Sequence, residues 1–308
     1  MSYRLGIDLG GTTAKIALVD EKGRVVKSAT VPSHGFPVPQ VLARQCAETC
    51  HRLLDGKKIK RVGVGVAGDI DFDRGVVRVS PNLGWKNVPL KKMLQASFRC
   101  DVIVDNDANA AAWGLYKTQV PKSVKNMIAV TLGTGVGGGL VLNGELYRGG
   151  TGSAGEVGHM TMDENGRLCN CGNRGCLETY AGAIHLVRRV KEDLAQGQRS
   201  SLQKIYKTAP ETITPLLLSQ EARKGDSYAR KVWADVGHVL GLALGNLVYV
   251  FNPEFIILTG GIAQAKGLIL TPLLKTLRKR TFKTPIRHVN VHVADEAPNM
   301  GVIGASLL

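Results

Sequence analysis

The sequence has few aromatic residues, no long uninterrupted hydrophobic run and no secretory leader. Aromatic residues make up 5% of the 308 positions and are not interleaved with the basic clusters as platforms for stacked bases. The longest hydrophobic run, 239–251, is interrupted by Asn246 and is too short to cross a bilayer, so we predict no membrane insertion. The first nine residues are typical of a strand and lack the features of a signal peptide. We therefore expect a cytoplasmic protein.

Acidic residues are also scarce relative to basic ones. The 25 Asp and Glu residues stand against 40 Lys and Arg residues, which gives a formal net charge of +15. Such a balance is typical of proteins that bind nucleic acids or anionic small molecules. The basic residues are scattered, however, with only modest clusters at 57–61, 91–92 and 278–283. We interpret the charge as a solvated surface that helps to attract a nucleotide triphosphate, and predict no nucleic-acid partner.

The six cysteines are too unevenly placed for a disulfide framework. Three of them are dispersed, whereas Cys169, Cys171 and Cys176 fall within eight residues in a glycine-rich segment that follows His159. Three thiolates and one imidazole match a closed tetrahedral zinc site. Because all four positions around the ion would be filled by protein, we predict a structural Zn²⁺ that does not activate water.

The order of predicted strands and helices repeats along the chain. The first cycle has strands at 4–8, 14–19, 25–29, 61–66 and 102–104, with helices at 38–54, 88–98 and 108–116. The second has strands at 127–132, 139–142, 255–258 and 289–293, with helices at 177–196, 227–251 and 301–307. Two such cycles indicate a duplicated α/β fold with two lobes and a central cleft. We expect lobes at 1–118 and 119–297, with a C-terminal helix at 298–308 packing back on the first.

Glycine-rich loops follow the first strand of each cycle. The first loop contains Gly10, Gly11 and Thr12, and the second, at 131–139, contains Thr134 and Gly135. Glycines between strands expose backbone N–H groups that suit phosphate, and Asp8 at a strand end suits Mg²⁺ held through water. A plain hairpin turn would explain either loop alone, but two at equivalent places can hold a triphosphate from both sides. A third pair, 260–261, could let an adenine approach the backbone.

A strand end at 104–110 carries several polar side chains. Asp107 there is either a helix N-cap or a general base that accepts a hydroxyl proton as the alcohol attacks a phosphorus. Asn106 can donate and accept hydrogen bonds to neighbouring hydroxyls. Near the cysteines, Glu156 and Glu178 are either simply exposed, or lie on segments that zinc holds in place so that their carboxylates accept hydrogen bonds from sugar hydroxyls. In the second case, the ring nitrogen of His159 that does not bind zinc can donate a hydrogen bond to the sugar.

These motifs together resemble the ROK family of sugar kinases, within the wider sugar-kinase, actin and heat-shock ATPase fold. The resemblance rests on DLGGTTAK at 8–15, VDNDANAAAWG at 104–114, LGTGVGGG at 132–139 and the segment 155–178, and it runs essentially from Tyr3 to Leu308. The segments 65–71 and 80–90 look most like the bacterial ROK glucokinases. Two departures are Ala67, where glucokinases usually have proline, and the run ADEAPN at 294–299.

The resemblance implies a role for each matching residue. Asp107 matches the catalytic base that takes the proton of the sugar's 6-hydroxyl. The matching residues for sugar are Asn82, Asn106, Asp107, Glu156, His159 and Glu178; for ATP with Mg²⁺, Asp8, Gly10, Gly11, Thr12, Lys15, Thr134, Gly135 and Gly261; for zinc, His159, Cys169, Cys171 and Cys176.

The predicted activity is phosphorylation of a hexose at the 6-hydroxyl, with glucose and ATP as the expected substrates. An N-acetylhexosamine kinase is the alternative within kinases, because discrimination at C2 depends on pocket shape. A ROK transcriptional repressor is disfavoured, since the phosphate-loop strand begins at Arg4 and leaves no room for a preceding helix-turn-helix. A non-catalytic sugar-binding protein would not need Asp107 and both glycine loops intact. We also expect a homo-oligomer, dimer or tetramer. The sequence leaves polyphosphate open as a donor.

Overall fold

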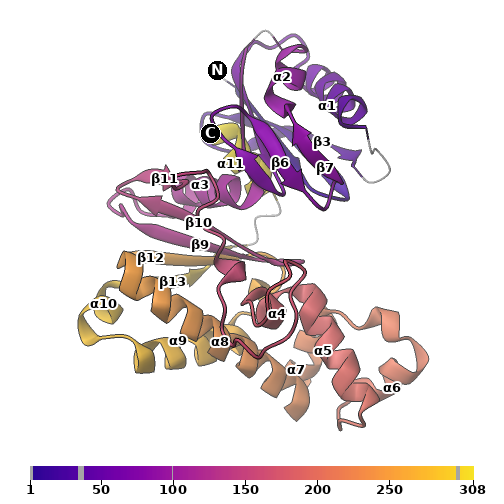
Figure 1. Ribbon diagram of the computed structural model, residues 1–308, viewed down its shortest axis with the longest axis vertical. Helices are drawn as coiled ribbons and strands as arrows, with labels where there is room; N and C mark the ends of the chain where they lie inside the picture. The colour runs from indigo at the N-terminus through magenta and orange to yellow at the C-terminus, as the bar shows by residue number, and fades with distance from the viewer. Residues whose placement is uncertain (1–2, 34–37, 99, 296–298) are drawn as a thin grey trace. The chain divides into compact units, whose positions relative to one another are not determined.

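The computed structural model describes residues 3–33, 38–98, 100–295 and 299–308 (Figure 1). The chain forms two compact units. The first comprises Met1–Lys125, Gly139–Gly155 and Ala297–Leu308, and the second Asn126–Gly138 and Glu156–Glu296. Gly139–Gly155 belongs to the first unit, although we expected it in the second lobe at 119–297. Part of the atypical run at 294–299, residues 296–298, lies outside the described residues, as does the first position of the helix expected at 298–308.

The first unit is built on a five-stranded sheet of order β3-β2-β1-β4-β8. Strands β1 and β2 form the expected glycine hairpin and β3 extends it antiparallel, whereas β4 and β8 run parallel to β1. The bounds are β1 Tyr3–Leu9, β2 Thr13–Asp20, β3 Val25–Pro32, β4 Ile59–Val66 and β8 Asp101–Asn106. Helices α1 Pro39–Leu54 and α2 Leu90–Gln95 cover a buried aliphatic core that includes Leu5, Ile7 and Leu42. Helix α3, Asp107–Gln119, follows β8 directly.

A small antiparallel sheet, β5-β6-β7, was missed by the sequence analysis. Its strands are β5 Asp69–Asp71, β6 Val76–Ser80 and β7 Trp85–Val88. The predicted helix at 88–98 was too long, because Trp85 and Val88 are buried strand residues and the helix begins only after Pro89. The short strands gave too little alternation to distinguish them from a loop.

Helix α11, Met300–Leu307, packs on β1, β4 and α3 of the first unit (yellow in Figure 1). The approach is so close that it requires glycine. A Cβ at Gly63 would overlap the carbonyl oxygen of Ala305, and a Cβ at Gly304 would overlap that of Ala110. The Trp113 indole N–H also donates to the Leu307 carbonyl at 2.9 Å.

The second five-stranded sheet has the order β11-β10-β9-β12-β13, which repeats the arrangement of the first. Again a hairpin partner is antiparallel, while β12 runs parallel to both β9 and β13. The strands are β9 Met127–Leu132, β10 Val136–Leu142, β11 Glu145–Tyr147, β12 Phe255–Thr259 and β13 Asn290–Val293. The predicted duplication of an α/β fold is therefore confirmed.

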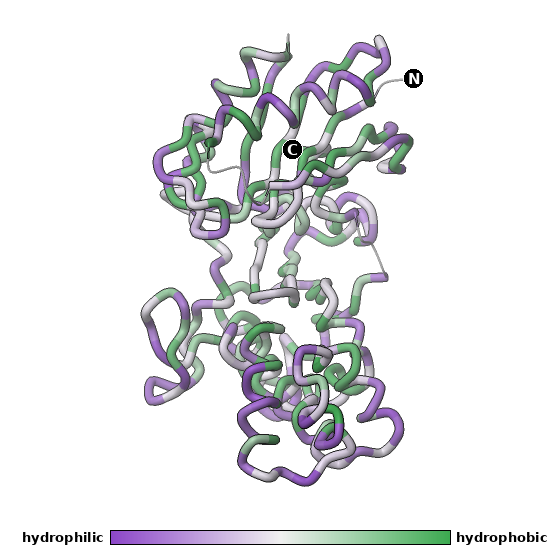
Figure 2. Tube along the Cα trace, turned by 90° about the vertical axis from the view of Figure 1, so that its right-hand side faces the viewer, coloured by the Kyte–Doolittle hydropathy of each residue, from purple (hydrophilic) through white to green (hydrophobic). Residues whose placement is uncertain are grey.

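Apart from β9, β12, β13 and the start of β10, the regular elements of the second unit are helical. Its α-helices are α4 Glu178–Ala181, α5 Ala183–Ala195, α6 Leu202–Thr208, α7 Pro215–Lys224, α8 Ser227–Phe251, α9 Gly267–Arg280 and α10 Lys283–His288, with 3-10 turns at Val157–His159, Pro210–Thr212 and Ala263–Ala265. Gly182 caps both α4 and α5 in extended conformation, so the single helix predicted at 177–196 is two. Figure 2 shows hydrophilic residues interspersed with hydrophobic ones along the helices.

Helix α8 extends well beyond the hydrophobic run at 239–251, which we judged too short to cross a bilayer. Its 25 residues include an 18-residue window with mean hydropathy 1.4, which by length and composition is apolar enough to cross a bilayer. Half of that window is buried inside the protein, and α8 packs against α7 and α9. Burial of this kind is also found in core helices of soluble proteins, so the helix is weak evidence for a membrane location.

Candidate functional site

The hydrogen bonds at the start of helix α3 show whether Asp107 is the N-cap, one of the two roles expected for it. Asn106 is the N-cap: its Oδ1 accepts hydrogen bonds from the N–H groups of Ala108 at 2.8 Å and Asn109 at 3.1 Å. Its Nδ2 donates to the Gly68 carbonyl at 3.0 Å. Capping is therefore done by Asn106. The Asp107 carboxylate accepts the N–H of the adjacent Ala108 at 2.9 Å, and the two N–H groups bound by Asn106 already have their cap, so capping does not account for Asp107.

Two carboxylates share this corner of the first unit. Burial raises the pKa of Asp107 above its ordinary value. Burial also raises the pKa of Asp8 to about 6, and the negative charge of Asp107 adds to that shift while Lys15 opposes it. A carboxylate whose pKa lies closer to neutrality is a better proton acceptor at neutral pH. Two such carboxylates are chemically suited to accept a proton or to bind a hydrated divalent cation.

The first glycine loop is a closed turn. The Gly10 N–H donates to the Thr13 carbonyl at 3.1 Å, and the Ser33 N–H and hydroxyl bind the carbonyls of Thr12 and Gly10. The N–H of Gly10 is thus used within the turn and is not directed at a phosphate. Asn82 lies against this loop, since a Cβ at Gly11 would sit 2.8 Å from the Asn82 Cβ.

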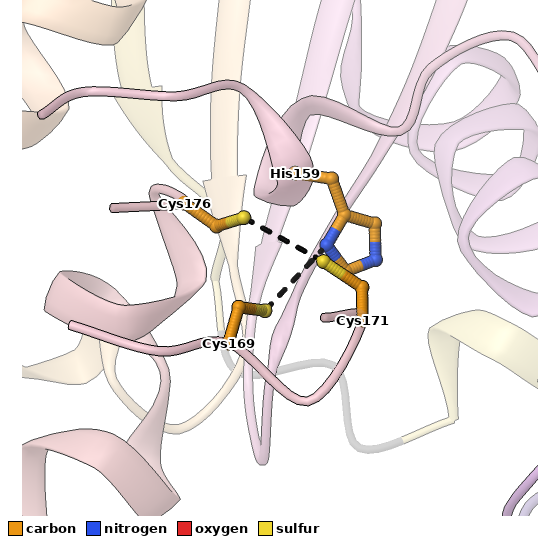
Figure 3. A group of neighbouring side chains, drawn as sticks. All are labelled: His159, Cys169, Cys171 and Cys176. Carbon is orange, nitrogen blue, oxygen red and sulfur yellow. Dashed lines mark hydrogen bonds between the residues drawn. The ribbon is translucent and has the colours of Figure 1, made fainter. Parts of the chain in front are cut away.

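The four predicted zinc ligands lie together in the second unit (Figure 3). Their ligand atoms all lie within 4.8 Å of one another. The Cys171 and Cys176 sulfurs are 3.7 Å apart, and the Cys169 sulfur is 3.9 Å from Nδ1 of His159. Ligands at about 2.0–2.3 Å from a tetrahedral zinc are separated by roughly 3.5–4 Å, so the donor set and its spacing fit Zn²⁺.

His159 uses its two ring nitrogens differently. Nδ1 faces the sulfurs, whereas Nε2 points away from them (Figure 3) and lies 4.0 Å from the Glu156 carboxylate. With a metal on Nδ1, the Nε2 position carries the ring proton and becomes a donor. The structure therefore brings His159 and Glu156 together as neighbouring donor and acceptor groups.

Glu178 contacts the second glycine loop, which the sequence analysis did not foresee. Its Oε2 accepts a hydrogen bond from the Val136 N–H at 3.0 Å, and its Oε1 lies 3.9 Å from the Cys169 sulfur. The next residues hold the same loop, because the N–H groups of Ala183 and Ile184 donate to the carbonyls of Gly133 and Thr134. The zinc-ligand segment and the second glycine loop, including Gly135, are thus one hydrogen-bonded assembly.

The third glycine pair closes against the end of β9. Gly260 has φ +96° and a Cβ there would overlap the Leu132 carbonyl, which accepts a hydrogen bond from Ile262. A Cβ on Gly261, by contrast, would meet nothing within 4 Å. The positive φ and the close packing against Leu132 therefore require glycine at position 260, whereas Gly261 has open space beside it.

A buried ion pair near Asp107 was missed entirely. Arg148 follows strand β11, and its Nε lies 2.8 Å from Oδ2 of Asp105. Asp105 belongs to the polar run at 104–110 that the sequence analysis noticed, but its partner lies 43 residues away. No local pattern in the sequence connects the two.

The predicted site residues fall into two groups. Asp8, Gly10, Gly11, Thr12, Lys15, Asn82, Asn106 and Asp107 belong to the first unit, and Thr134, Gly135, Glu156, His159, Cys169, Cys171, Cys176, Glu178 and Gly261 to the second.

The chain is similar to several known proteins over most of its length. The chain is 35% identical to the glucokinase of Thermotoga maritima over 305 residues, which cover 98% of this chain and 95% of that protein. It is also 35% identical, over 80% of its length and 62% of the relative's, to a putative xylose repressor from Caldicellulosiruptor. Its structure matches that of a ROK family glucokinase from Streptomyces griseus in complex with glucose and AMPPNP, with TM-score 0.84 and 31% identity over 99% of this chain and 98% of the other.

The match to the ROK family itself extends over residues 4–308. The resemblance first suggested by the glycine loops and the cysteine cluster is therefore confirmed, and with it the α/β sugar-kinase fold. This chain belongs to the ROK family.

Proposed function

We propose that the protein is an ATP-dependent hexose kinase that converts glucose to glucose 6-phosphate. The observation that carries the proposal is the half-buried carboxylate of Asp107, which stands at the start of α3 while Asn106 does the capping. Relatives that are glucokinases align along nearly the whole chain, which supports the same assignment.

The chemistry assigned to Asp107 is general-base catalysis. Its carboxylate accepts the proton of the glucose 6-hydroxyl while that oxygen attacks the γ-phosphorus of ATP, and ADP leaves with the electrons of the broken P–O bond. We assign hydrogen bonding of the sugar hydroxyls to Asn82, Asn106, Glu156, His159 and Glu178.

The nucleotide is assigned to the glycine loops. The first loop, with Gly10, Gly11 and Thr12, and the second, with Thr134 and Gly135, are proposed to bind the phosphates. Gly261 is assigned to the nucleoside side, and Lys15 lies near the first loop. Asp8 would hold Mg²⁺ through water, and that ion supplies neutralisation of the charge on the phosphates. Zinc at His159, Cys169, Cys171 and Cys176 would have a structural role only.

Glucose is preferred over N-acetylglucosamine and N-acetylmannosamine in this proposal, because the chain's segments 65–71 and 80–90 resemble glucokinases. A site that hydrogen-bonds a 2-hydroxyl rejects an analogue without it by about 10⁴-fold, whereas a merely tight apolar wall gives roughly 10². Measuring kcat/KM for the three sugars with ATP and Mg²⁺ tests the order. A higher value for either amino sugar would replace glucokinase by N-acetylhexosamine kinase.

Four further measurements address the remaining alternatives. Replacing ATP by polyphosphate should abolish turnover, which identifies the donor. A repressor, the class to which one relative belongs, would bind operator DNA and show no phosphotransfer. Size-exclusion chromatography with light scattering tests the expected dimer or tetramer, and cell fractionation tests the expected cytoplasmic location.

A further inference from the structure

The carboxylate of Asp105 is the most completely buried acidic group at the start of α3. Its side chain is 2% exposed, and it stands two residues before Asp107 at the end of strand β8. Oδ1 accepts the N–H of Asn106 at 2.8 Å and Nδ2 of Asn109 at 3.0 Å. Oδ2 accepts Nε of Arg148 at 2.8 Å. A buried carboxylate of this kind needs its charged partner, because desolvation disfavours an unpaired charge.

Arg148 is held in one orientation by further contacts. Its guanidinium lies over the ring of Phe72, with the guanidinium carbon 3.7 Å from the ring centroid. Its carbonyl accepts the Ala154 N–H at 3.0 Å, and the neighbouring Ser153 hydroxyl donates to Asp69 at 2.8 Å. A planar guanidinium that is stacked and hydrogen-bonded cannot be replaced by lysine without loss of geometry. Arg148 is therefore built to orient one carboxylate.

The bonds of Asp105 reach both sides of the proposed base. Asn106 immediately precedes Asp107, and Asn109 lies in the first turn of α3. A single carboxylate oxygen thus fixes the backbone before Asp107 and a side chain after it. Asp8 on β1 interacts electrostatically with Asp107 and with Lys15 on β2, and the pair of Asp105 with Arg148 stands two residues before Asp107 at the end of β8.

We propose that Arg148 is a positioning residue for phosphoryl transfer: through its ion pair with Asp105 it holds the start of α3, and thereby the carboxylate of Asp107, in the orientation that accepts the sugar proton. The inference rests on the proposed kinase activity. Arg148 does not contact substrate in this assignment and contributes by orientation and by its positive charge.

The test compares Arg148→Met with Arg61→Met in the full chain, using glucose, ATP and Mg²⁺. Arg61 is a matched control, because it also belongs to the first unit and pairs with an aspartate of strand β8, Asp101, but at an exposed position. Arg148→Met should lower kcat about 10- to 100-fold, the range for a catalytic group misplaced by up to an ångström, and leave both KM values within about twofold. Arg61→Met should leave kcat unchanged.

A second readout separates positioning from loss of stability. Loss of the positive charge should shift the acidic limb of the kcat–pH profile to higher pH, because the negative charge of Asp105, two residues before Asp107, then lacks its Arg148 partner. The double variant Arg148→Met/Asp105→Asn removes the uncompensated charge and should recover part of the lost kcat. If Arg148→Met does not fold, Arg148→Lys is measured instead and should still lower kcat without raising KM.

Unchanged kcat and pH profile in the folded Arg148 variant would overturn the inference, as would a rise in KM alone. If the wild-type protein phosphorylates no hexose, the proposed function fails, and the inference is then decided by carbon-13 NMR titration of Asp107. A higher Asp107 pKa in Arg148→Met than in wild type supports it, and an equal pKa overturns it.

Discussion

The carboxylate of Glu178 accepts a hydrogen bond from the backbone N–H of Val136, 3.0 Å away. Glu178 follows the last cysteine of the metal cluster by two residues, and Val136 begins strand β10 after the second glycine loop. A change in the cysteine segment is therefore transmitted to the loop assigned to the phosphates of ATP. The position of two groups therefore depends on the His159 and cysteine cluster: the side chains proposed to bind sugar, and this loop.

Loss of zinc should weaken both sugar and nucleotide binding. Replacing Cys171 with serine, or removing metal with a strong chelator, takes away a thiolate ligand and releases the segment that carries Glu178. We expect activity to be abolished and the affinities for glucose and a non-hydrolysable ATP analogue, measured by calorimetry, each to fall about tenfold or more.

Cys100→Ser is the control for this experiment, since Cys100 is a partly buried thiol outside the cluster. Elemental analysis should find about one zinc per chain in the control and wild type. Full activity in metal-free protein would refute the structural role of the ion.

Replacing Asp107 with asparagine should lower kcat by about 10²-fold or more while glucose binding is largely kept, because the variant loses the proton acceptor and retains the shape. Single-turnover kinetics and calorimetry with glucose measure the two effects. Asp101→Asn, which alters an exposed carboxylate paired with Arg61 and Lys91, should leave kcat unchanged. Near-normal turnover in Asp107→Asn would assign the residue to the helix start alone.

Asp8→Asn should stabilise the ligand-free protein at neutral pH. Burial raises the pKa of Asp8 from 3.8 to about 6 in the folded state, so folding favours the protonated form. Below pH 3.8 both states are protonated and the shift has no effect; as pH rises through 3.8–6 stability is lost, and above pH 6 the loss is complete. The gain from the substitution is at most about 3 kcal/mol.

Urea unfolding of wild type and Asp8→Asn at pH 3.5 and 7.5 tests this sign. The difference in the free energy of unfolding should be present at pH 7.5 and absent at pH 3.5. Addition of ATP with Mg²⁺ should stabilise the wild type and have less effect on the variant, because the proposed cation contact is gone. A variant that is less stable at pH 7.5 than the wild type would contradict the prediction.

Gly63→Ala should destabilise the protein by about 1–3 kcal/mol or more, because the added methyl group would overlap the Ala305 carbonyl and force α11 away from β4. Gly150→Ala is the matched control in the same unit, since a Cβ there would meet nothing within 4 Å. Thermal unfolding of both variants measures the difference. Equal melting temperatures would show that α11 adjusts without cost.

Elements with strong periodicity or unusual composition could be predicted from the sequence. Helix α8 was predicted with its observed bounds because its apolar positions recur over 25 residues, and the zinc cluster was evident because four ligands lie close in sequence. The β5-β6-β7 sheet was missed because its strands have only three to five residues. The break at Gly182 was missed because apolar spacing continues across it.

Contacts between distant segments could not be predicted in the same way. The bond of Glu178 to Val136 and the pair of Arg148 with Asp105 span 42 and 43 residues, and both depend on how the strands are ordered in space. The capping residue of α3 could not be predicted either. By residue type, position 106 or 107 can cap the helix, and the backbone angles of Asn106, φ −65° and ψ 147°, decide that Asn106 is the cap.

The packing of α11 on β1, β4 and α3 bears on how the chain acquires its structure during synthesis. Residues Met300–Leu307 are made about 290 residues after β1, yet they fill the space beside Gly63 and Ala110. The part of the first sheet that α11 covers beside α3 should therefore stay uncovered while the second unit is translated. We expect that nascent chains arrested before α11 expose this part of the sheet to chaperones, and that release of α11 ends their protease sensitivity.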